Sequence, residues 1–388
     1  MDPLKPRGFI WFAAQDWWYH NQAHSDFQLM KEVSRTWPVL VVNSLGLRVP
    51  GPSTSTQPVR RILRKLRSMT RLLKRPLDEF PRFHVFTPIM LPVYGGQGAL
   101  HRFNAWLIRS QVRLAARIAG LPSAPAIGVT IPTAWPVVEP MKRTALIFNR
   151  SDLHSAFPEA NGGWVAELER QLLTFSDHVL YVSHELMRRD ELVVGGRSYF
   201  IDHGVDLDHF TCDGSIHPDI ERIPGPRVGF FGGLDDYVVD MPLLADVARG
   251  VSRASLVLIG DATCSMEEVT SASNVHWLGF RDYADIPALG RGFDVAIMPW
   301  LNNEWIRYAN PIKLKEYLAL GLPVVSTDYP EVEAYRGEIR VADRREDFVG
   351  LVNEALDNPG DAAERVEFVR PFSWAGRARA LMSLVEES

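Results

Sequence analysis

The sequence predicts an α/β fold in which two Rossmann-like domains, each built on a parallel sheet, face each other across a cleft. Its length of 388 residues is too great for one ordinary core and suits two domains of about 150–200 residues each. In both halves, short and almost continuously apolar runs alternate with helical patterns, which is typical of parallel strands covered on both faces. Ligands of such sheets bind at the carboxyl ends of the strands, so we expect the active site in the cleft.

The predicted elements follow this alternation along the chain. In the first half the expected strands are Phe9–Ala13, Val39–Val42, Ala126–Thr130, Thr144–Phe148, His178–Val182 and Ser198–Ile201. Helices are expected near 23–35, 100–119 and 164–175. In the second half the expected strands are Arg227–Phe231, Ser255–Ile259, Asp294–Met298, Val324–Ser326 and Ile339–Val341. A stretch rich in Pro, Gly and Asp, Cys212–Pro226, is interpreted as the linker.

Composition limits the class of protein. With 46% hydrophobic residues and a mean hydropathy of −0.08, the chain is expected to be soluble and globular. It has no run of about 18 apolar residues that could span a membrane, and its first residues lack the pattern of a cleaved signal peptide. Cys212 and Cys264 are far apart and have no metal-type spacing, which fits a reducing cytoplasm.

The net charge of −5 hides an asymmetry between the two halves. The chain up to His203 has 25 Lys and Arg against 16 Asp and Glu, whereas the remainder has 17 against 31. Eight of these cations lie between Arg60 and Arg75 with no acid among them, and the apolar residues between them recur at helical spacing. This pattern predicts a basic amphipathic helix that binds an anionic membrane surface. A solvated helix packed through its leucines is the alternative, and nucleic acid is disfavoured because no recognisable nucleic-acid module accompanies the run.

The most informative stretch is Asn310–Thr327, NPIKLKEYLALGLPVVST. It reads as a helix with proline at its first position and Gly321 at its end, followed by a buried strand. The start of such a helix presents free N–H groups and the positive end of its dipole to an anion. Lys313 adds a cation for a phosphate, and Glu316 one turn later adds a carboxylate for a diol. The pattern therefore favours a nucleotide-sugar site, with an ordinary amphipathic helix as the alternative.

Several segments in order along the chain resemble the GT-B glycosyltransferases of the large family-4-like group. They are HGVDLDHF (His203–Phe210), GFFGGLDDYVVDMPLLADVA (Gly229–Ala248), LVLIGD (Leu256–Asp261), WLGF (Trp277–Phe280), FDVAIMPW (Phe293–Trp300) and the Asn310–Thr327 stretch. The match is specific from about Phe175 to Ser326 and loose before Asp152. Many members carry a glutamate eight residues before the one matching Glu316, and here that position is Tyr308. This departure makes the chain more similar to the exopolysaccharide glucuronosyltransferase-like members, in which a lysine binds phosphate as Lys313 would.

The resemblance implies a division of labour. Residues 1–205 would form an acceptor-binding domain, residues 206–370 a nucleotide-sugar-binding domain, and residues 371–388 a helix that crosses back to the first domain. The enzyme would transfer a sugar from a nucleoside diphosphate sugar to a hydroxyl of a glycan acceptor, without a metal or other cofactor. A lipid-linked acceptor would explain the basic helix and would place the protein in the cytoplasm, peripherally on the inner face of the cell membrane. A nucleotide-sugar epimerase of similar fold and a non-catalytic glycan-assembly scaffold remain alternatives.

The donor would be held by residues at the carboxyl ends of the second domain's strands. Gly232 and Gly233 follow the strand VGFF, where a tight turn lets backbone N–H groups approach a phosphate, although the GxGxxG spacing of dinucleotide folds is absent. Phe280 or Tyr283 would stack on the nucleobase by resemblance, and a plain core role fits them as well. The remaining candidate donor contacts are Trp300, Asn310, Ile312, Lys313 and Glu316.

The candidate base is Asp152, which lies where a strand runs into a polar turn. It matches the general base of the glucuronosyltransferase-like members, and a carboxylate suits removal of a proton from the acceptor hydroxyl. A cap on the following helix is the alternative role, and His154 is a rival base. Further candidate acceptor contacts are Trp17, His20, His24 and Arg48. The Asp206-Leu207-Asp208 sequence mimics a metal-binding motif, but we assign it to the crossing between domains and expect no metal there.

Overall fold

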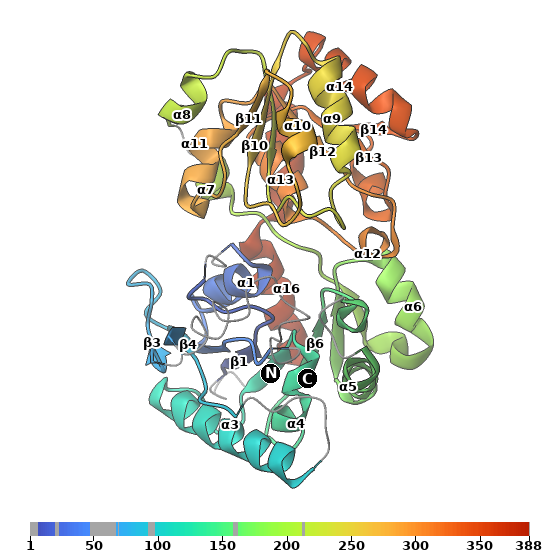
Figure 1. Cartoon of the computed structure of the whole chain (residues 1–388). Helices are drawn as coiled ribbons and strands as arrows, with labels where there is room; N and C mark the ends of the chain where they lie inside the picture. The colour runs from blue at the N-terminus through green and yellow to red at the C-terminus, as the bar shows by residue number, and fades with distance from the viewer. Residues whose placement is uncertain are drawn as a thin grey trace. The chain divides into compact units, whose positions relative to one another are not determined.

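The computed structural model describes residues 7–19, 23–46, 67–68, 70–91, 98–157, 162–211 and 214–387, and it divides into two units (Figure 1). The N-terminal unit runs to Asp202 and includes the last helix from Trp374 onward, and the C-terminal unit is His203–Ser373. The segment expected to be the linker belongs to the C-terminal unit where it is described. Ile220 and Ile223 are buried there in the unit's core, and this apolar anchoring is why the linker interpretation is wrong.

The N-terminal unit is built on an eight-stranded sheet with the order β3-β4-β2-β1-β5-β6-β7-β8. Every neighbouring pair is parallel except β3 with β4. The strands are β1 (Phe9–Phe12), β2 (Val39–Val42), β3 (Leu73–Lys74), β4 (Phe83–Phe86), β5 (Ala126–Val129), β6 (Leu146–Arg150), β7 (His178–Tyr181) and β8 (Ser198–Phe200). The central strands are buried along their whole length, as the apolar runs predict.

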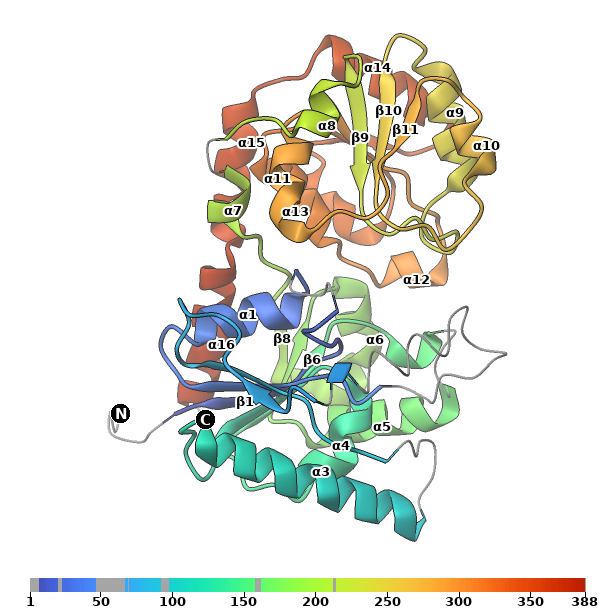
Figure 2. The same cartoon turned by 60° about the vertical axis from the view of Figure 1, so that its left-hand side comes forward.

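Helices cover both faces of this sheet, with α1 and α16 on one side and α3 and α4 on the other (Figure 2). The helices are α1 (Ser25–Val33), α3 (Ala99–Ile118), α4 (Trp135–Val138), α5 (Gly162–Phe175), α6 (His184–Val194) and α16 (Trp374–Glu387). Short 3-10 turns lie at η1 (Pro132–Ala134), η2 (His154–Ala156) and η3 (Gly195–Arg197). Helix α16 packs against α1 and buries Trp374, Ala378 and Leu381. The apolar stripe of the last helix therefore has its partner surface inside the N-terminal unit.

The C-terminal unit has a six-stranded parallel sheet with the order β11-β10-β9-β12-β13-β14. Its strands are β9 (Arg227–Phe231), β10 (Ser255–Ile259), β11 (Val275–Trp277), β12 (Val295–Met298), β13 (Val324–Thr327) and β14 (Arg340–Ala342). Chain order within the sheet is therefore 3-2-1-4-5-6, the order of doubly wound nucleotide-binding folds.

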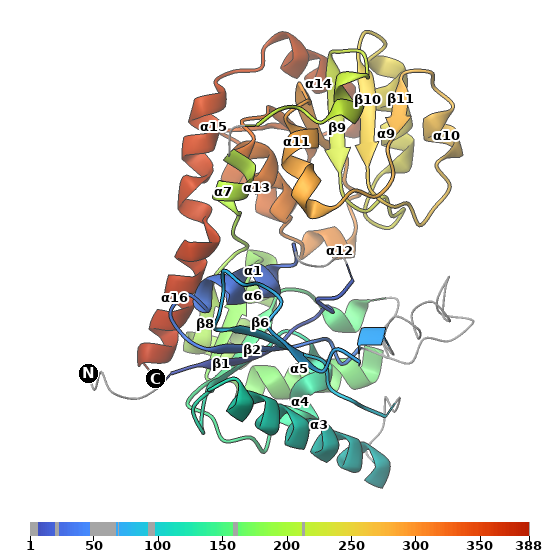
Figure 3. The ribbon, with the colours of Figure 1, turned by 90° about the vertical axis from the view of Figure 1, so that its left-hand side faces the viewer.

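Two apolar cores sandwich this sheet (Figure 3). One core includes residues of α7 (Leu207–Thr211), α8 (Pro218–Glu221), α11 (Ile286–Gly290), α13 (Ile312–Ala319) and α15 (Ala362–Val369). The other includes residues of α9 (Met241–Gly250), α10 (Glu267–Thr270) and α14 (Phe348–Asp357). Helix α12 (Glu304–Arg307) follows β12, and 3-10 turns lie at η4 (Tyr283–Asp285), η5 (Pro330–Tyr335), η6 (Arg345–Asp347) and η7 (Arg370–Phe372). Both predicted parallel sheets are thus present, which confirms the fold class.

Half of the predicted basic helix over Arg60–Arg75 lies outside the described residues. Arg67 and Ser68 are helical, but Leu73–Lys74 forms β3 and pairs antiparallel with β4. The helix prediction is therefore wrong at its C-terminal end, because β4 offers an edge whose backbone groups pair with this segment. Strand β4 itself was not predicted. Among the described helices, none is both long enough and apolar enough to cross a bilayer.

A glycine inside the N-terminal sheet provides a test of this packing. In β5, a Cβ on Gly128 would lie 2.0 Å from a ring carbon of Trp11, which is fully buried. Gly128→Ala should therefore lower the free energy of unfolding by at least about 1–3 kcal/mol, measured by denaturant unfolding. Gly350→Ala is the matched control, because Gly350 is exposed in α14 with open space around its Cα. It should gain about 0.5–1 kcal/mol, and equal effects of the two changes would contradict the packing described.

Candidate active site

The centre of the C-terminal sheet holds a topological switch point, because β9 and β12 are neighbours whose connections lead to opposite sides of the sheet. Gly232 follows β9 with φ of 141°, and Gly260 follows β10 with the same φ. A Cβ on Gly260 would lie 1.9 Å from the carbonyl oxygen of Gly232, so the two turns touch backbone to backbone. Gly232 also donates its N–H to the Ile259 carbonyl at 2.9 Å. Gly233, the next residue, is exposed.

Lys313 reaches this glycine turn from the first turn of α13. Pro311 is the N-cap of that helix rather than its first residue, with φ −75° and ψ 129°. The Lys313 Nζ lies 4.7 Å from the centroid of the Phe230 ring and 6.0 Å from that of Trp300. A Cβ on Gly232 would be only 2.2 Å from this nitrogen, so a larger residue would displace the ammonium group from its present position. The far end of α13 has Gly321 at φ 73°, as its sequence predicts.

The side chain of Lys313 is partly buried. Burial lowers the pKa of Lys313 to about 8, against the charges of Glu316 and Asp235, which raise it. The group is therefore still mainly protonated at pH 7 but is poorly hydrated. A desolvated cation beside backbone N–H groups is an environment in which an anion binds strongly.

Glu316 lies one turn further along α13 and is 7% exposed. The hydroxyl of Tyr283 donates to its Oε1 at 3.3 Å. Burial raises the pKa of Glu316 to about 7, while Lys313 and the Tyr283 bond lower it. The centroid of the Tyr283 ring lies 4.7 Å from that of the His209 ring. This packing fixes the ring, and the Tyr283 hydroxyl in turn positions the Glu316 carboxylate. Phe280, in the loop after β11, is 40% exposed.

Trp300 follows β12 at the carboxyl end of the same sheet. Its ring packs 5.2 Å from that of Tyr329, and its backbone N–H donates to Thr327 Oγ1 at 3.1 Å. The indole N–H is buried and has no hydrogen-bond partner in the part of the chain that the structure describes. Asn310, just before the helix, is also buried, and Ile312 is partly exposed. The structure thus brings Gly232, Trp300, Lys313, Glu316 and Tyr283 into one chain of contacts.

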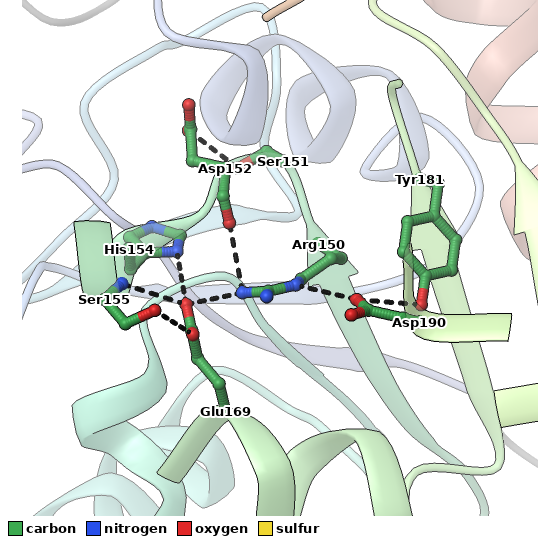
Figure 4. Close-up of polar contacts among 8 residues, drawn as sticks. All are labelled: Arg150, Ser151, Asp152, His154, Ser155, Glu169, Tyr181 and Asp190. Carbon is green, nitrogen blue, oxygen red and sulfur yellow. Dashed lines mark hydrogen bonds and ion pairs between the residues drawn. The ribbon is translucent and has the colours of Figure 1, made fainter. Parts of the chain in front are cut away.

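In the N-terminal unit, a buried ion network lies at the end of β6 (Figure 4). Arg150 is 2% exposed, and its guanidinium donates to Glu169 Oε1 at 2.5 Å and to Asp190 Oδ2 at 3.2 Å. Glu169 also accepts from the Ser155 hydroxyl at 2.7 Å. One guanidinium therefore satisfies two buried carboxylates and fixes the loop that follows β6.

Asp152 lies on this loop with its side chain pointing away from the Arg150 network (Figure 4). Its backbone carbonyl accepts from Arg150 Nη1 at 3.2 Å, and its Oδ2 accepts from the Ser151 hydroxyl at 3.2 Å. The turn η2 begins after Leu153 without a side-chain cap, so Asp152 does not serve as a cap. Burial raises the pKa of Asp152 to about 7, although the Ser151 bond and Arg150 lower it. A carboxyl with this pKa can accept a proton near neutral pH.

His154 is in a different environment from Asp152. It is 2% exposed, its ring packs 5.1 Å from that of Phe157, and its Nδ1 is 4.0 Å from Glu169 Oε1. Burial lowers the pKa of His154 to about 4, so the imidazole is neutral at pH 7. This enclosed position favours Asp152 over His154 as the group that meets an acceptor.

Of the other candidate acceptor contacts, Trp17 and His24 are described, whereas His20 and Arg48 lie outside the described residues. Trp17 is 3% exposed and packs between Phe27 and Phe83, with ring centroids 5.2 and 5.3 Å away. It therefore has a packing role and no open face for a sugar ring. His24 caps α1, because its Nδ1 accepts from the Asp26 N–H at 3.3 Å.

The sequence analysis missed Asp26, which is fully buried at the start of α1. Its Oδ1 accepts from Trp11 Nε1 at 2.9 Å and from Thr130 Oγ1 at 2.5 Å, and its Oδ2 accepts from the Ala14 N–H at 2.8 Å. Asn149 Nδ2 donates to Oδ1 at 3.2 Å. The carboxylate thus joins the ends of β1, β5 and β6 at the switch point of the N-terminal sheet. The sequence signal that could have pointed to Asp26 is an acidic residue in the first turn of a predicted helix.

The Asp206-Leu207-Asp208 stretch opens α7. Asp206 Oδ1 accepts from the backbone N–H of His209 at 3.2 Å, so this carboxylate caps the helix start. Among the residues that the structure describes, no three His, Cys, Asp or Glu side chains gather as metal ligands.

Comparisons with known proteins agree with this architecture. Residues 225–358 match the family model described as "Glycosyl transferases group 1". A Bacillus subtilis (strain 168) protein, TuaH, whose name assigns it to teichuronic acid biosynthesis as a glycosyltransferase, is 26% identical over 238 residues. The aligned part covers 56% of this chain and 59% of that protein.

Two solved structures share the fold over nearly the whole chain. Sucrose-phosphate synthase from Thermosynechococcus elongatus superposes with a TM-score of 0.69 at 13% identity, covering 98% of each chain. Anabaena HepE in complex with UDP-glucose superposes with a TM-score of 0.64 at 15% identity, covering 98% of this chain and 100% of that chain. Residues 225–358 are thus similar to the group 1 glycosyltransferases, and the chain as a whole shares the GT-B fold of these solved structures.

Proposed function

We propose that the protein transfers a glycosyl group from a nucleoside diphosphate sugar to a hydroxyl of a glycan acceptor, without a metal ion or other cofactor. The observation that carries this proposal is the position of the Lys313 ammonium group against the Gly232 turn, on a partly buried side chain. A cation in this position at the carboxyl end of a doubly wound sheet suits a diphosphate.

The donor site is supported by complementary groups on the C-terminal unit. The diphosphate would meet Lys313, the backbone at Gly232 and Gly233, and the N–H groups at the start of α13. The buried indole N–H of Trp300 is available as a further donor to the ligand. Glu316, supported by Tyr283, would accept hydrogen bonds from a diol of the donor. The solved HepE structure that shares this fold contains UDP-glucose, which makes a nucleotide sugar a reasonable ligand class for this chain.

The chemical step uses one base and one cation. Asp152 takes the proton of the acceptor hydroxyl while that oxygen forms a bond to the anomeric carbon of the donor. The bond between the anomeric carbon and the phosphate oxygen breaks, and its electron pair leaves with the nucleoside diphosphate. The leaving group then carries the added negative charge, which Lys313 and the dipole of α13 stabilise. The cation thus replaces a metal at this position.

The acceptor proposed here is a lipid-linked glycan in polysaccharide or glycolipid synthesis on the cytoplasmic face of the cell membrane. The name of the relative TuaH refers to teichuronic acid biosynthesis, which supports a glycan acceptor. The departure at Tyr308 supports a subgroup similar to the exopolysaccharide glucuronosyltransferases. Thermal-shift screening against nucleoside diphosphates and their sugars identifies the donor.

Replacement of Lys313 tests the donor site. Lys313→Met should weaken binding of the nucleoside diphosphate selected by the screen by about 10–100-fold in calorimetry, because a charge-assisted contact is lost. Lys142→Met is the matched control, since Lys142 is exposed in the N-terminal unit, and it should bind like the wild type. Unchanged affinity in Lys313→Met would contradict the donor assignment.

Replacement of Asp152 tests the base. Asp152→Asn should keep its fold and its affinity for the donor but lose about 10²–10⁴-fold in the rate of glycosyl transfer, since the amide cannot take the proton. Asp78→Asn changes an exposed carboxylate of the same unit and should transfer at the wild-type rate. Near-normal transfer by Asp152→Asn would remove the base assignment. Conversion of donor into a second nucleotide sugar without an acceptor would indicate an epimerase instead.

The two pKa shifts also predict a pH profile. Activity needs Asp152 deprotonated, which requires a pH above about 7, and Lys313 protonated, which requires a pH below about 8. We therefore expect a narrow bell in kcat/KM centred between these values. In Lys313→Arg the acid limb should stay in place, while the alkaline limb should move above pH 10 because a guanidinium stays charged. An alkaline limb that remains near pH 8 would show that another group sets it.

A further inference from the structure

Helix α3 lies on the outside of the N-terminal unit (Figure 2), and it exposes several large apolar side chains. Fourteen large apolar side chains are exposed among the described residues, and five of them belong to this one helix. They are Leu100, Phe103, Trp106, Leu114 and Ile118, between 50% and 67% exposed. Two of them, Phe103 and Trp106, pack ring to ring at 5.6 Å. We call this row the α3 apolar stripe.

The opposite side of α3 accounts for its attachment to the unit. Asn104, Ala105, Ile108, Val112, Ala115 and Ala116 are buried. Because a helix advances 100° per residue, these positions lie on the face opposite Phe103 and Leu114. The stripe is therefore not needed to hold α3 in place, and no described part of the chain covers it.

Arginines follow one edge of the α3 apolar stripe. Arg102, Arg109, Arg113 and Arg117 recur at spacings of seven, four and four residues, which places them in one row along the helix. The helix Ala99–Ile118 contains no Asp or Glu. Arg109 and Arg113 also donate to the carbonyls of Val137 and Pro140 at 3.4 and 3.3 Å. The charge of Glu139 acts on Arg109 and raises its pKa, although burial and Arg113 lower it overall.

We propose that α3 docks the protein on an anionic lipid bilayer, with its apolar stripe in the interface and its arginine row against the lipid headgroups. An aromatic and aliphatic face beside a purely basic edge is the composition of helices that lie in the plane of a membrane. Trp106 has an amphipathic ring that suits the headgroup boundary, and Phe103 adds apolar area beside it. Charge complementarity selects acidic lipids, because the arginine row has no carboxylate within its own helix.

This surface is formed by other residues than the Arg60–Arg75 segment, half of which lies outside the described residues. It also does not depend on the proposed glycosyl transfer, since docking on lipid needs neither donor nor acceptor. A lipid-linked acceptor would nevertheless reach a docked enzyme by diffusion in two dimensions. The inference therefore gives the N-terminal unit a second role beside acceptor activation.

Co-sedimentation of the full chain with vesicles tests the proposal without any sugar nucleotide. We expect binding to vesicles with about one third phosphatidylglycerol, weakened by salt, and little binding to phosphatidylcholine alone. Arg102→Gln/Arg113→Gln/Arg117→Gln should lower the partition coefficient on the order of a hundredfold, since each cation contributes about fivefold. Phe103→Ser/Trp106→Ser/Leu114→Ser should lower it by roughly tenfold or more.

Matched controls separate docking from general effects of charge and polarity. Arg170→Gln/Arg188→Gln/Arg249→Gln removes the same charge from exposed arginines that are paired with carboxylates, and Leu192→Ser removes a fully exposed leucine from α6. Both should bind vesicles like the wild type. Melting temperatures of all variants should match the wild type, because each substituted side chain is exposed.

A second readout reports on insertion. Brominated acyl chains should quench part of the tryptophan fluorescence of the wild type, and Trp106→Phe should lose that quenched part while still binding. The proposal is overturned if the wild type does not bind acidic vesicles, or if either α3 triple variant binds as well as its control. It is also overturned if lipid-free wild type is a dimer that the apolar triple variant dissociates, since the stripe would then join two copies of the chain.

Discussion

The candidate site of the C-terminal unit depends on the topological switch point at the centre of its sheet. Neighbouring strands β9 and β12 send their connections to opposite sides, so neither connection covers the carboxyl ends between them. The Gly232 turn and α13 border this gap, and Lys313 lies against the turn with its charge poorly hydrated. A side chain larger than glycine at position 232 would occupy the place of the ammonium group. The electrostatics of the site therefore follow from backbone geometry first and from side-chain chemistry second.

In the N-terminal unit, buried charged side chains hold the strand ends and the loop after β6 in place. Asp26 joins three strand ends through four donors, and Arg150 binds two buried carboxylates at the end of β6. Breaking such a cluster leaves an uncompensated charge in the interior, which makes each member costly to replace singly. The loop after β6 is fixed by these bonds, so Asp152 keeps its carboxylate out of the network. A rigid support with one carboxyl left outside it is the arrangement that a general base needs.

Much of the fold was predictable because parallel strands buried on both faces leave continuous apolar runs in the sequence. Strands β1, β2, β9 and β10 were found in this way to within a residue. Strand β4 was missed because it is short, follows Pro81 and Arg82, and contains His84, and β3 was missed because two residues carry no periodicity. The grouping of Lys313 with Gly232 could be anticipated, since both follow central strands of one sheet. The buried roles of Asp26 and Arg150 could not be identified, because the same charged residue types form both buried contacts and solvated surface pairs. The prediction that Trp17 contacts the acceptor was wrong for a similar reason, because the sequence does not show whether an aromatic ring points into the core.

Helix α16 has a consequence for the order in which the molecule can be completed. The C-terminal unit is one uninterrupted segment, whereas the N-terminal unit needs α16, whose Leu381 is fully buried and whose Arg377 pairs with Asp202. Arg7, just before β1, also pairs with Glu386 at 2.5 Å. During synthesis, the strands of the N-terminal unit must therefore wait for a helix that is made after the whole C-terminal unit. All strands and helices of the C-terminal unit are therefore synthesised before the N-terminal unit can complete its fold.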